Sequence, residues 1–272
     1  MKTNKYKILV LSDLSKSTDT ILKTSITLAK TIDGEIDFLV VKKPIDMVPF
    51  DNQFSAMRSI KEKYKITENK VKALVDSISE EYDFNISFSV GFGNVKNEIE
   101  RYIVRNQPDI IVLGKQKNKM MKLVGGDLTQ FVLKVHKGAV LLASTDSNTL
   151  QPESQLSLGV YSEKEPLANI AFAKELLNET KSPVKSFKVV KNKSKETSQS
   201  APKNGFVEYV FEDSPNSINT IDTYVLKNNI NLFYIDRGGN TDVLKSNSER
   251  QLKEVIEKLN VSVLLPGITK YA

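Results

Sequence analysis

The chain has 272 residues, of which 40% are hydrophobic and 26% are charged, and its formal net charge is +6 at pH 7. This composition is typical of a globular protein with one large or two ordinary domains. There is no cysteine and one histidine, which excludes disulfides, thiolate or multi-histidine metal sites and cysteine nucleophiles. Lysines are spread over most predicted helices, without interleaved aromatic residues on one element, so nucleic-acid binding is not predicted.

The N-terminal segment predicts a strand rather than a targeting or membrane segment. Its apolar run, residues 8–12, spans five residues and is followed by Asp13. That is too short for a signal peptide or a membrane span. Together with the lack of cysteine, this predicts a cytoplasmic protein that has no contact with a membrane.

Residues 1–146 alternate five predicted strands with four predicted helices. Thr18 or Asp19 is the expected cap of the first helix and Gly34 its stop. Residues 66–69 leave open whether the second helical segment is one helix or two. The alternation predicts a parallel sheet covered on both faces. The strands are expected at 7–12, 36–41, 84–90, 109–113 and 139–143, and the helices at 19–33, 52–81, 95–106 and after Gly126.

The same order repeats after a polar linker, residues 147–154, which predicts a second domain at 155–272. The counterpart of the second helix is missing. In its place, residues 191–205 are polar without apolar periodicity, which predicts a loop. The repeated strands are expected at 156–161, 184–190, 206–212, 231–236 and 261–265, and the helices at 166–178, 217–228 and 247–259.

Residues 108–144 read as a strand, a lysine-rich loop, a Gly125-Gly126 turn, a helix and a strand. With the opening ILVLSDLSKSTD, this segment resembles the universal stress protein family, whose signature there is Gly-x2-Gly-x9-Gly-Ser/Thr. Gly114 supplies the first glycine, and Gly126 with Thr129 fits the last part. The resemblance implies an α/β fold of two tandem adenine nucleotide alpha hydrolase-like domains, the second degenerate. Each would be a five-stranded, mostly parallel sheet flanked by helices.

The resemblance also implies a nucleotide site at the ends of these strands. Asp13 would face adenine or ribose, and Val41 would line the adenine pocket. A turn residue that caps the next helix is the alternative interpretation of Asp13. Gly125 and Gly126, at a helix start, offer backbone amides to phosphate.

Two departures from the family pattern affect this site. Lys117 stands in place of the middle glycine and Asp127 in place of the small hydroxyl residue, with one spacer residue missing. Because a carboxylate at a helix start can cap the free amides and repel a triphosphate, the leading prediction is a weakened or lost site. The protein would then be a regulatory or binding protein that acts through protein contacts and requires no cofactor. The alternative is ATP or AMP binding by the first domain, with slow ATP hydrolysis.

Other chemistry finds no support in the sequence. No catalytic arrangement and no metal site can be defended from the residue spacing. His136 lies near a helix end, where capping is the favoured role. An adenylate-forming enzyme on the related fold would need a glycine-rich loop after the first strand, and residues 12–19 contain no glycine.

The family resemblance also implies how the two halves meet. Single domains of that family pair through their fifth strands, and a tandem chain can make the same contact within itself. Residues 139–143 and 261–265 are apolar and short, and pairing them removes two aggregation-prone edges. We expect an intramolecular pseudo-dimer through these strands. The sequence names no protein partner.

Overall fold

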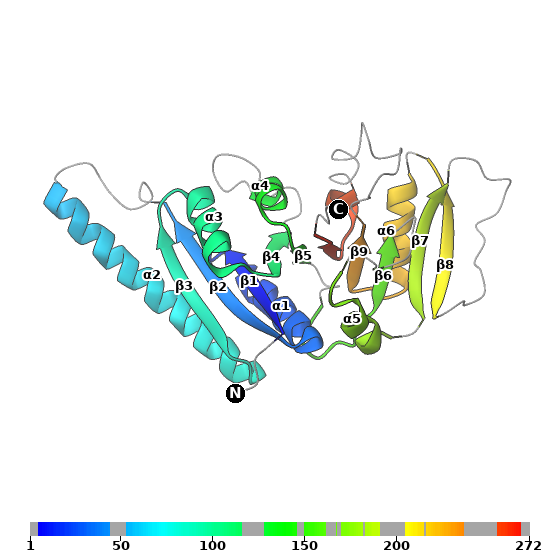
Figure 1. Cartoon of the computed structure of the whole chain (residues 1–272), viewed down its shortest axis with the longest axis horizontal. Helices are drawn as coiled ribbons and strands as arrows, with labels where there is room; N and C mark the ends of the chain where they lie inside the picture. Colours follow the sequence, from blue (N-terminus) through cyan, green and yellow to red (C-terminus); the bar gives the residue numbers. More distant parts are fainter. Residues whose placement is uncertain are drawn as a thin grey trace.

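The computed structural model describes residues 5–43, 53–115, 128–145, 150–161, 167, 170–181, 183–190, 205–214, 216–236 and 255–267, with backbone only at 53–59. Ten strands form one sheet in the order β3-β2-β1-β4-β5-β10-β9-β6-β7-β8. The first five strands therefore make one half of the sheet and the last five the other, in mirrored order (Figure 1).

The first half is a parallel five-stranded sheet. Each strand pairs in register with its neighbour, from Ile36 opposite Ile86 at one end to Lys115 opposite Ser144 at the other. The strands are rich in β-branched and aromatic residues, which fit a buried pleated surface. They are β1 (Tyr6–Ser12), β2 (Gly34–Lys42), β3 (Ile86–Phe92), β4 (Ile110–Lys115) and β5 (Ala139–Ser144).

Helices cover both faces of this half. α1 (Thr18–Ile32) and α2 (Gln53–Tyr82) share one apolar cluster with one face of the strands. α3 (Val95–Asn106) and α4 (Leu128–Val135) share the other. Segment 53–82, left open above, is a single helix, and α2 extends beyond β3 at one end of the molecule (Figure 1).

The predicted ends of α1 were wrong. Its N-cap position is Ser17, whose side chain makes no capping hydrogen bond, and neither Thr18 nor Asp19 precedes the helix. Asp33 ends α1 in the left-handed conformation, with φ 58°, a conformation that Asp tolerates better than most residues. Gly34 instead opens β2, where an added Cβ would lie 2.9 Å from Ile8 Cδ1.

The second half repeats the pattern with shorter elements. Its helix near 166–178 begins later than expected, at Ala173, because Leu167 is left-handed and residues 171–172 form a turn. Of the helix expected at 247–259, residues 255–258 are helical, and 247–254 lie outside the described residues, as does loop 191–204. The elements are β6 (Leu158–Tyr161), α5 (Ala173–Glu179), β7 (Val184–Val190), β8 (Phe206–Glu212), α6 (Ser217–Lys227), β9 (Leu232–Ile235) and β10 (Ser262–Leu265).

The two halves join through β5 and β10, which pair antiparallel with Leu141 opposite Leu264. At the end of this ladder two glycines meet, since a Cβ at Gly267 would lie 3.2 Å from Gly138 Cα. A second contact between the halves is the hydrogen bond that Tyr6 Oη donates to the Ala171 carbonyl at 3.2 Å. The halves therefore share one continuous sheet, and each of the two apolar clusters contains residues of both halves.

Candidate functional site

The candidate site lies where the strand order changes direction. In the order β3-β2-β1-β4-β5, the chain moves outward from β1 to β3 and then returns to the other side of β1 at β4. Ligands of open parallel sheets bind at the carboxyl ends of the strands at such a switch point. Ser12 ends β1 here, Lys42 ends β2 and Lys115 ends β4.

Asp13 is half-buried in the turn after β1, and its carboxylate is engaged within that turn. Its Oδ1 accepts a hydrogen bond from the Ser15 backbone N–H at 3.0 Å. Its carbonyl oxygen accepts from Lys42 Nζ at 2.7 Å. Asp13 thus forms an Asx turn, which a short polar side chain stabilises without glycine.

The rest of the β1–α1 connection forms a closed polar network. Ser12 Oγ and Thr18 Oγ1 lie 2.8 Å apart, and Ser12 Oγ also accepts from the Leu14 N–H at 3.1 Å. Leu14 takes φ 64°, a strained conformation for a residue with a Cβ. The hydroxyls and amides of this connection therefore bond chiefly to each other.

A small apolar cavity lies beside this turn. It has about 10 Å³ of water-accessible space, which is about enough for one water molecule. Val41 is among its walls, and four elements contribute other bulky side chains that the sequence interpretation did not include. The lining residues are Leu11, Ser12, Leu39, Val41, Val95, Ile99 and Leu128.

Gly114 has a packing role that the motif interpretation did not anticipate. It lies within β4, where an added Cβ would be 2.4 Å from Ile21 Cδ1 of α1. Its missing side chain therefore lets α1 approach the sheet. The neighbouring Lys115 extends its ammonium group to the Leu259 carbonyl of the second half, so this lysine links the halves at the strand end.

The phosphate side of the predicted site is only partly described. Lys117, Gly125, Gly126 and Asp127 lie outside the described residues. Thr129 is in the first turn of α4 and is 7% exposed. The structure thus brings Asp13 and Val41 to the same strand ends and places Gly114 on the neighbouring strand.

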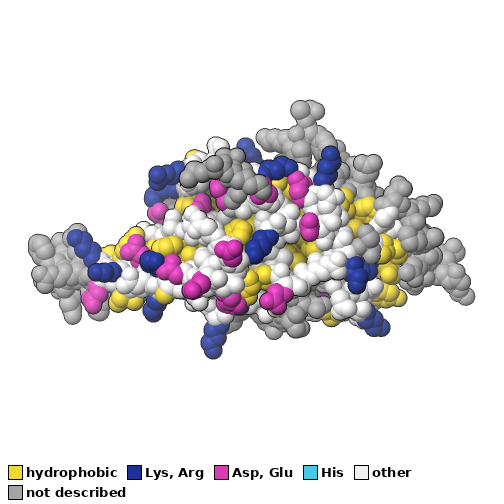
Figure 2. All heavy atoms as spheres, turned by 90° about the horizontal axis from the view of Figure 1, so that it is seen from below, with side chains coloured by type: hydrophobic (Ala, Val, Ile, Leu, Met, Phe, Trp, Pro, Cys, Tyr) yellow, Lys and Arg dark blue, Asp and Glu magenta, His cyan; other side chains and the backbone are white. Residues whose placement is uncertain are grey.

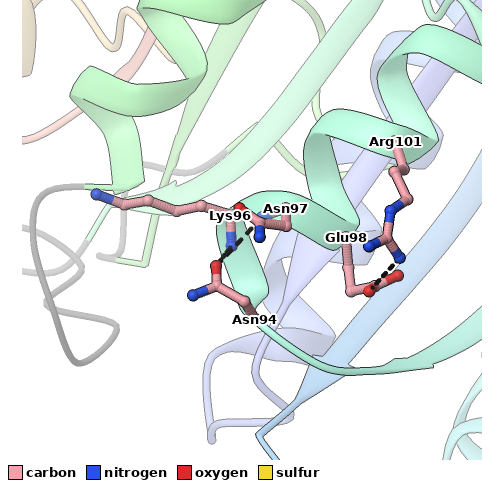
Figure 3. Close-up of polar contacts among 5 residues, drawn as sticks. All are labelled: Asn94, Lys96, Asn97, Glu98 and Arg101. Atoms are coloured by element: carbon pink, nitrogen blue, oxygen red, sulfur yellow. Dashed lines mark hydrogen bonds and ion pairs between the residues drawn. The ribbon is translucent and has the colours of Figure 1, made fainter.

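The start of α3 borders the cavity through Val95 and is already capped (Figure 3). Asn94 Oδ1 accepts from the N–H groups of Lys96 and Asn97 at 3.1 and 3.3 Å. This occupies amides that could otherwise bind an anion. Lys96 lies over the Phe131 ring of α4, with Nζ 5.5 Å from the centroid.

The structure also bears on the role of His136, on metal binding and on membrane-spanning helices. His136 directly follows α4 and is 3% exposed, and its backbone N–H donates to the Val132 carbonyl. Among the described residues, no group of three or more His, Cys, Asp or Glu side chains could hold a metal ion. Of the helices in the described ranges, none combines the length and apolarity needed to cross a membrane.

Comparison with known proteins establishes the family. Residues 6–144, just over half of the chain, match the model of the Universal stress protein family. The chain belongs to the universal stress protein family. No curated protein matches the sequence.

Solved structures extend the likeness over both halves. A universal stress protein from Archaeoglobus fulgidus DSM 4304 superimposes with a TM-score of 0.63 at 16% identity, covering 97% of each chain. A putative universal stress protein from Pseudomonas aeruginosa UCBPP-PA14 gives 0.59 at 12% identity, covering 96% of this chain and 92% of its own. These likenesses confirm the predicted α/β fold and the tandem arrangement.

Proposed function

We propose that this universal stress protein is a cytoplasmic regulatory or binding protein whose adenine-nucleotide site is weakened or lost, and that it acts through protein contacts. The observation that supports this most strongly is the cavity at the ends of β1 and β2. Apolar side chains reduce it to about 10 Å³, so a purine would have to displace well-packed residues, at a cost in stability.

The polar groups around the cavity support the same proposal. The Asp13 carboxylate accepts from Ser15, and Asn94 caps α3. A nucleotide would have to replace these internal hydrogen bonds, so each new contact would add little net affinity. Lys115 bonds to the Leu259 carbonyl, which would also be lost if it turned to a phosphate.

Titration of the full chain with ATP by calorimetry tests the proposal. We expect binding too weak to saturate at micromolar nucleotide. Each hydrogen bond to the nucleotide would replace a hydrogen bond already made within the protein, so little net binding free energy would be gained. A parallel titration with AMP distinguishes two causes of weak ATP binding, namely repulsion of the triphosphate and closure of the adenine pocket. A micromolar dissociation constant for either nucleotide would favour the alternative, a nucleotide-binding member of the family, and slow ATP hydrolysis would then be assayed.

A pair of variants is expected to identify what weakens the site. Lys117→Gly with Asp127→Ser restores the glycine and removes the carboxylate, and should raise ATP affinity if these two residues are the obstacle. Ile99→Ala, which widens the cavity wall, is the matched test of pocket size. A gain only with Ile99→Ala would assign the loss to the adenine pocket. No gain with either would leave the shortened loop as the cause.

A further inference from the structure

β3 forms one open end of the ten-stranded sheet. Among the described residues it pairs only with β2, and it lies at the sheet edge next to the projecting α2 (Figure 1). Its sequence, ISFSVGF, contains no charge and no proline. Natural edge strands are protected from pairing by charges, prolines, bulges or a covering helix or loop; β3 has no charge and no proline, and its register with β2 is unbroken.

The hydrogen-bonding groups on the free side of β3 can be identified. Gly93 N–H donates to the Lys42 carbonyl at 3.1 Å, so odd-numbered residues direct their backbone groups toward β2. Because the direction alternates along a strand, the even-numbered residues direct their N–H and C=O groups away from the sheet. These are Ile86, Phe88, Val90 and Phe92.

The opposite sheet edge, β8, is protected by charge. Asp213 N–H donates to the Val190 carbonyl, so the outward groups of β8 again belong to even-numbered residues. Two of these are Glu212 and Glu208, the latter ion-paired with Lys188 of β7. Carboxylates on the outward positions disfavour pairing with another strand. Among the described residues the two edge strands therefore differ, since β8 carries carboxylates and β3 carries no charge.

We propose that β3 is a dimer interface, in which it pairs antiparallel with β3 of a second copy of this chain around a twofold axis at Ser89. In that register Phe88 faces Val90 and Ile86 faces Phe92. Apolar residues thus meet apolar residues on the side of the sheet that α2 covers. No like charges oppose each other, and an antiparallel pair of identical strands closes the contact.

α2 contributes further apolar surface at the end of this ladder. Tyr64 is 38% exposed and packs on Phe92, with ring centroids 5.1 Å apart. In the dimer Phe92 would lie opposite Ile86 of the second copy, so the Tyr64 ring would be close to the contact. The second copy is favoured over an unrelated peptide because the strand complements itself over all its outward positions.

The first test blocks the edge without disturbing the existing ladder. Val90→Pro removes an outward-facing N–H, which β2 does not use, so the fold should persist. Val210→Pro makes the same change at the matching position of β8. Sedimentation analysis of the full chain should give a dimer for the original protein and for Val210→Pro, and a monomer for Val90→Pro. A monomeric original protein at high micromolar concentration would overturn the proposal, as would loss of the dimer in Val210→Pro alone.

The second test uses the absence of cysteine in this chain. Ser89 would face Ser89 of the second copy in a non-hydrogen-bonded pair, with Cα atoms about 4.5 Å apart, which suits a disulfide. Ser89→Cys should therefore form a covalent dimer under mild oxidation. Ser87→Cys, an exposed position on the same strand that would not face itself, is the control. Equal cross-linking of the two variants, with a normal circular dichroism spectrum, would overturn the proposed register.

Discussion

Residues 1–146 expressed without the second half are expected to form homodimers or aggregates rather than a soluble monomer. In the whole chain β5 is covered by β10, with Leu142 opposite Val263 and Val140 opposite Leu265. All residues of β5 are buried. Removing the second half exposes an apolar, uncharged strand edge, which pairs readily with another chain.

Size-exclusion chromatography with light scattering measures this outcome. The fragment should carry Val90→Pro, so that any dimer is attributable to β5 and not to β3. The full chain with Val90→Pro is the control and should stay monomeric. A fragment that remains a folded monomer at high concentration would contradict a structural role for the β5–β10 contact.

Gly138→Ala is expected to destabilise the protein by about 3 kcal/mol or more, at the upper end for overpacked sites. An added Cβ would lie 2.2 Å from the Asp109 carbonyl oxygen. That oxygen accepts the Ala139 N–H at 3.0 Å and holds the start of β5 in place, so it cannot move away cheaply. The clash involves backbone rather than a side chain end that could rotate.

Urea denaturation of the full chain checks this prediction. Gly91→Ala is the matched control, because its Cβ would meet nothing closer than Val41 Cγ2 at 3.6 Å, an ordinary contact. It should change the free energy of unfolding by less than about 1 kcal/mol. Equal effects of the two substitutions would mean that the close approach at Gly138 is relieved by backbone movement.

The sequence by itself determined the order and type of the elements. α3 matches its predicted range of 95–106, and β7 and β8 match 184–190 and 206–212. These segments have strong local signals in the period-two or helical spacing of their apolar residues. The family resemblance also follows from short motifs, since Gly114, Gly126 and Thr129 fit parts of the glycine signature although one spacer residue is missing.

Only the tertiary structure decided what the site residues do. Gly114 fits a phosphate motif, yet the Ile21 side chain of α1 packs against the position where a Gly114 side chain would lie. Asp13 is hydrogen-bonded within its own turn. The cavity walls come from β1, β2, α3 and α4. Such long-range contacts leave no local pattern, because a buried Leu or Ile has the same spacing whether it lines a pocket or fills a core. The open β3 edge likewise depends on strand order, which the linear spacing of apolar residues does not specify.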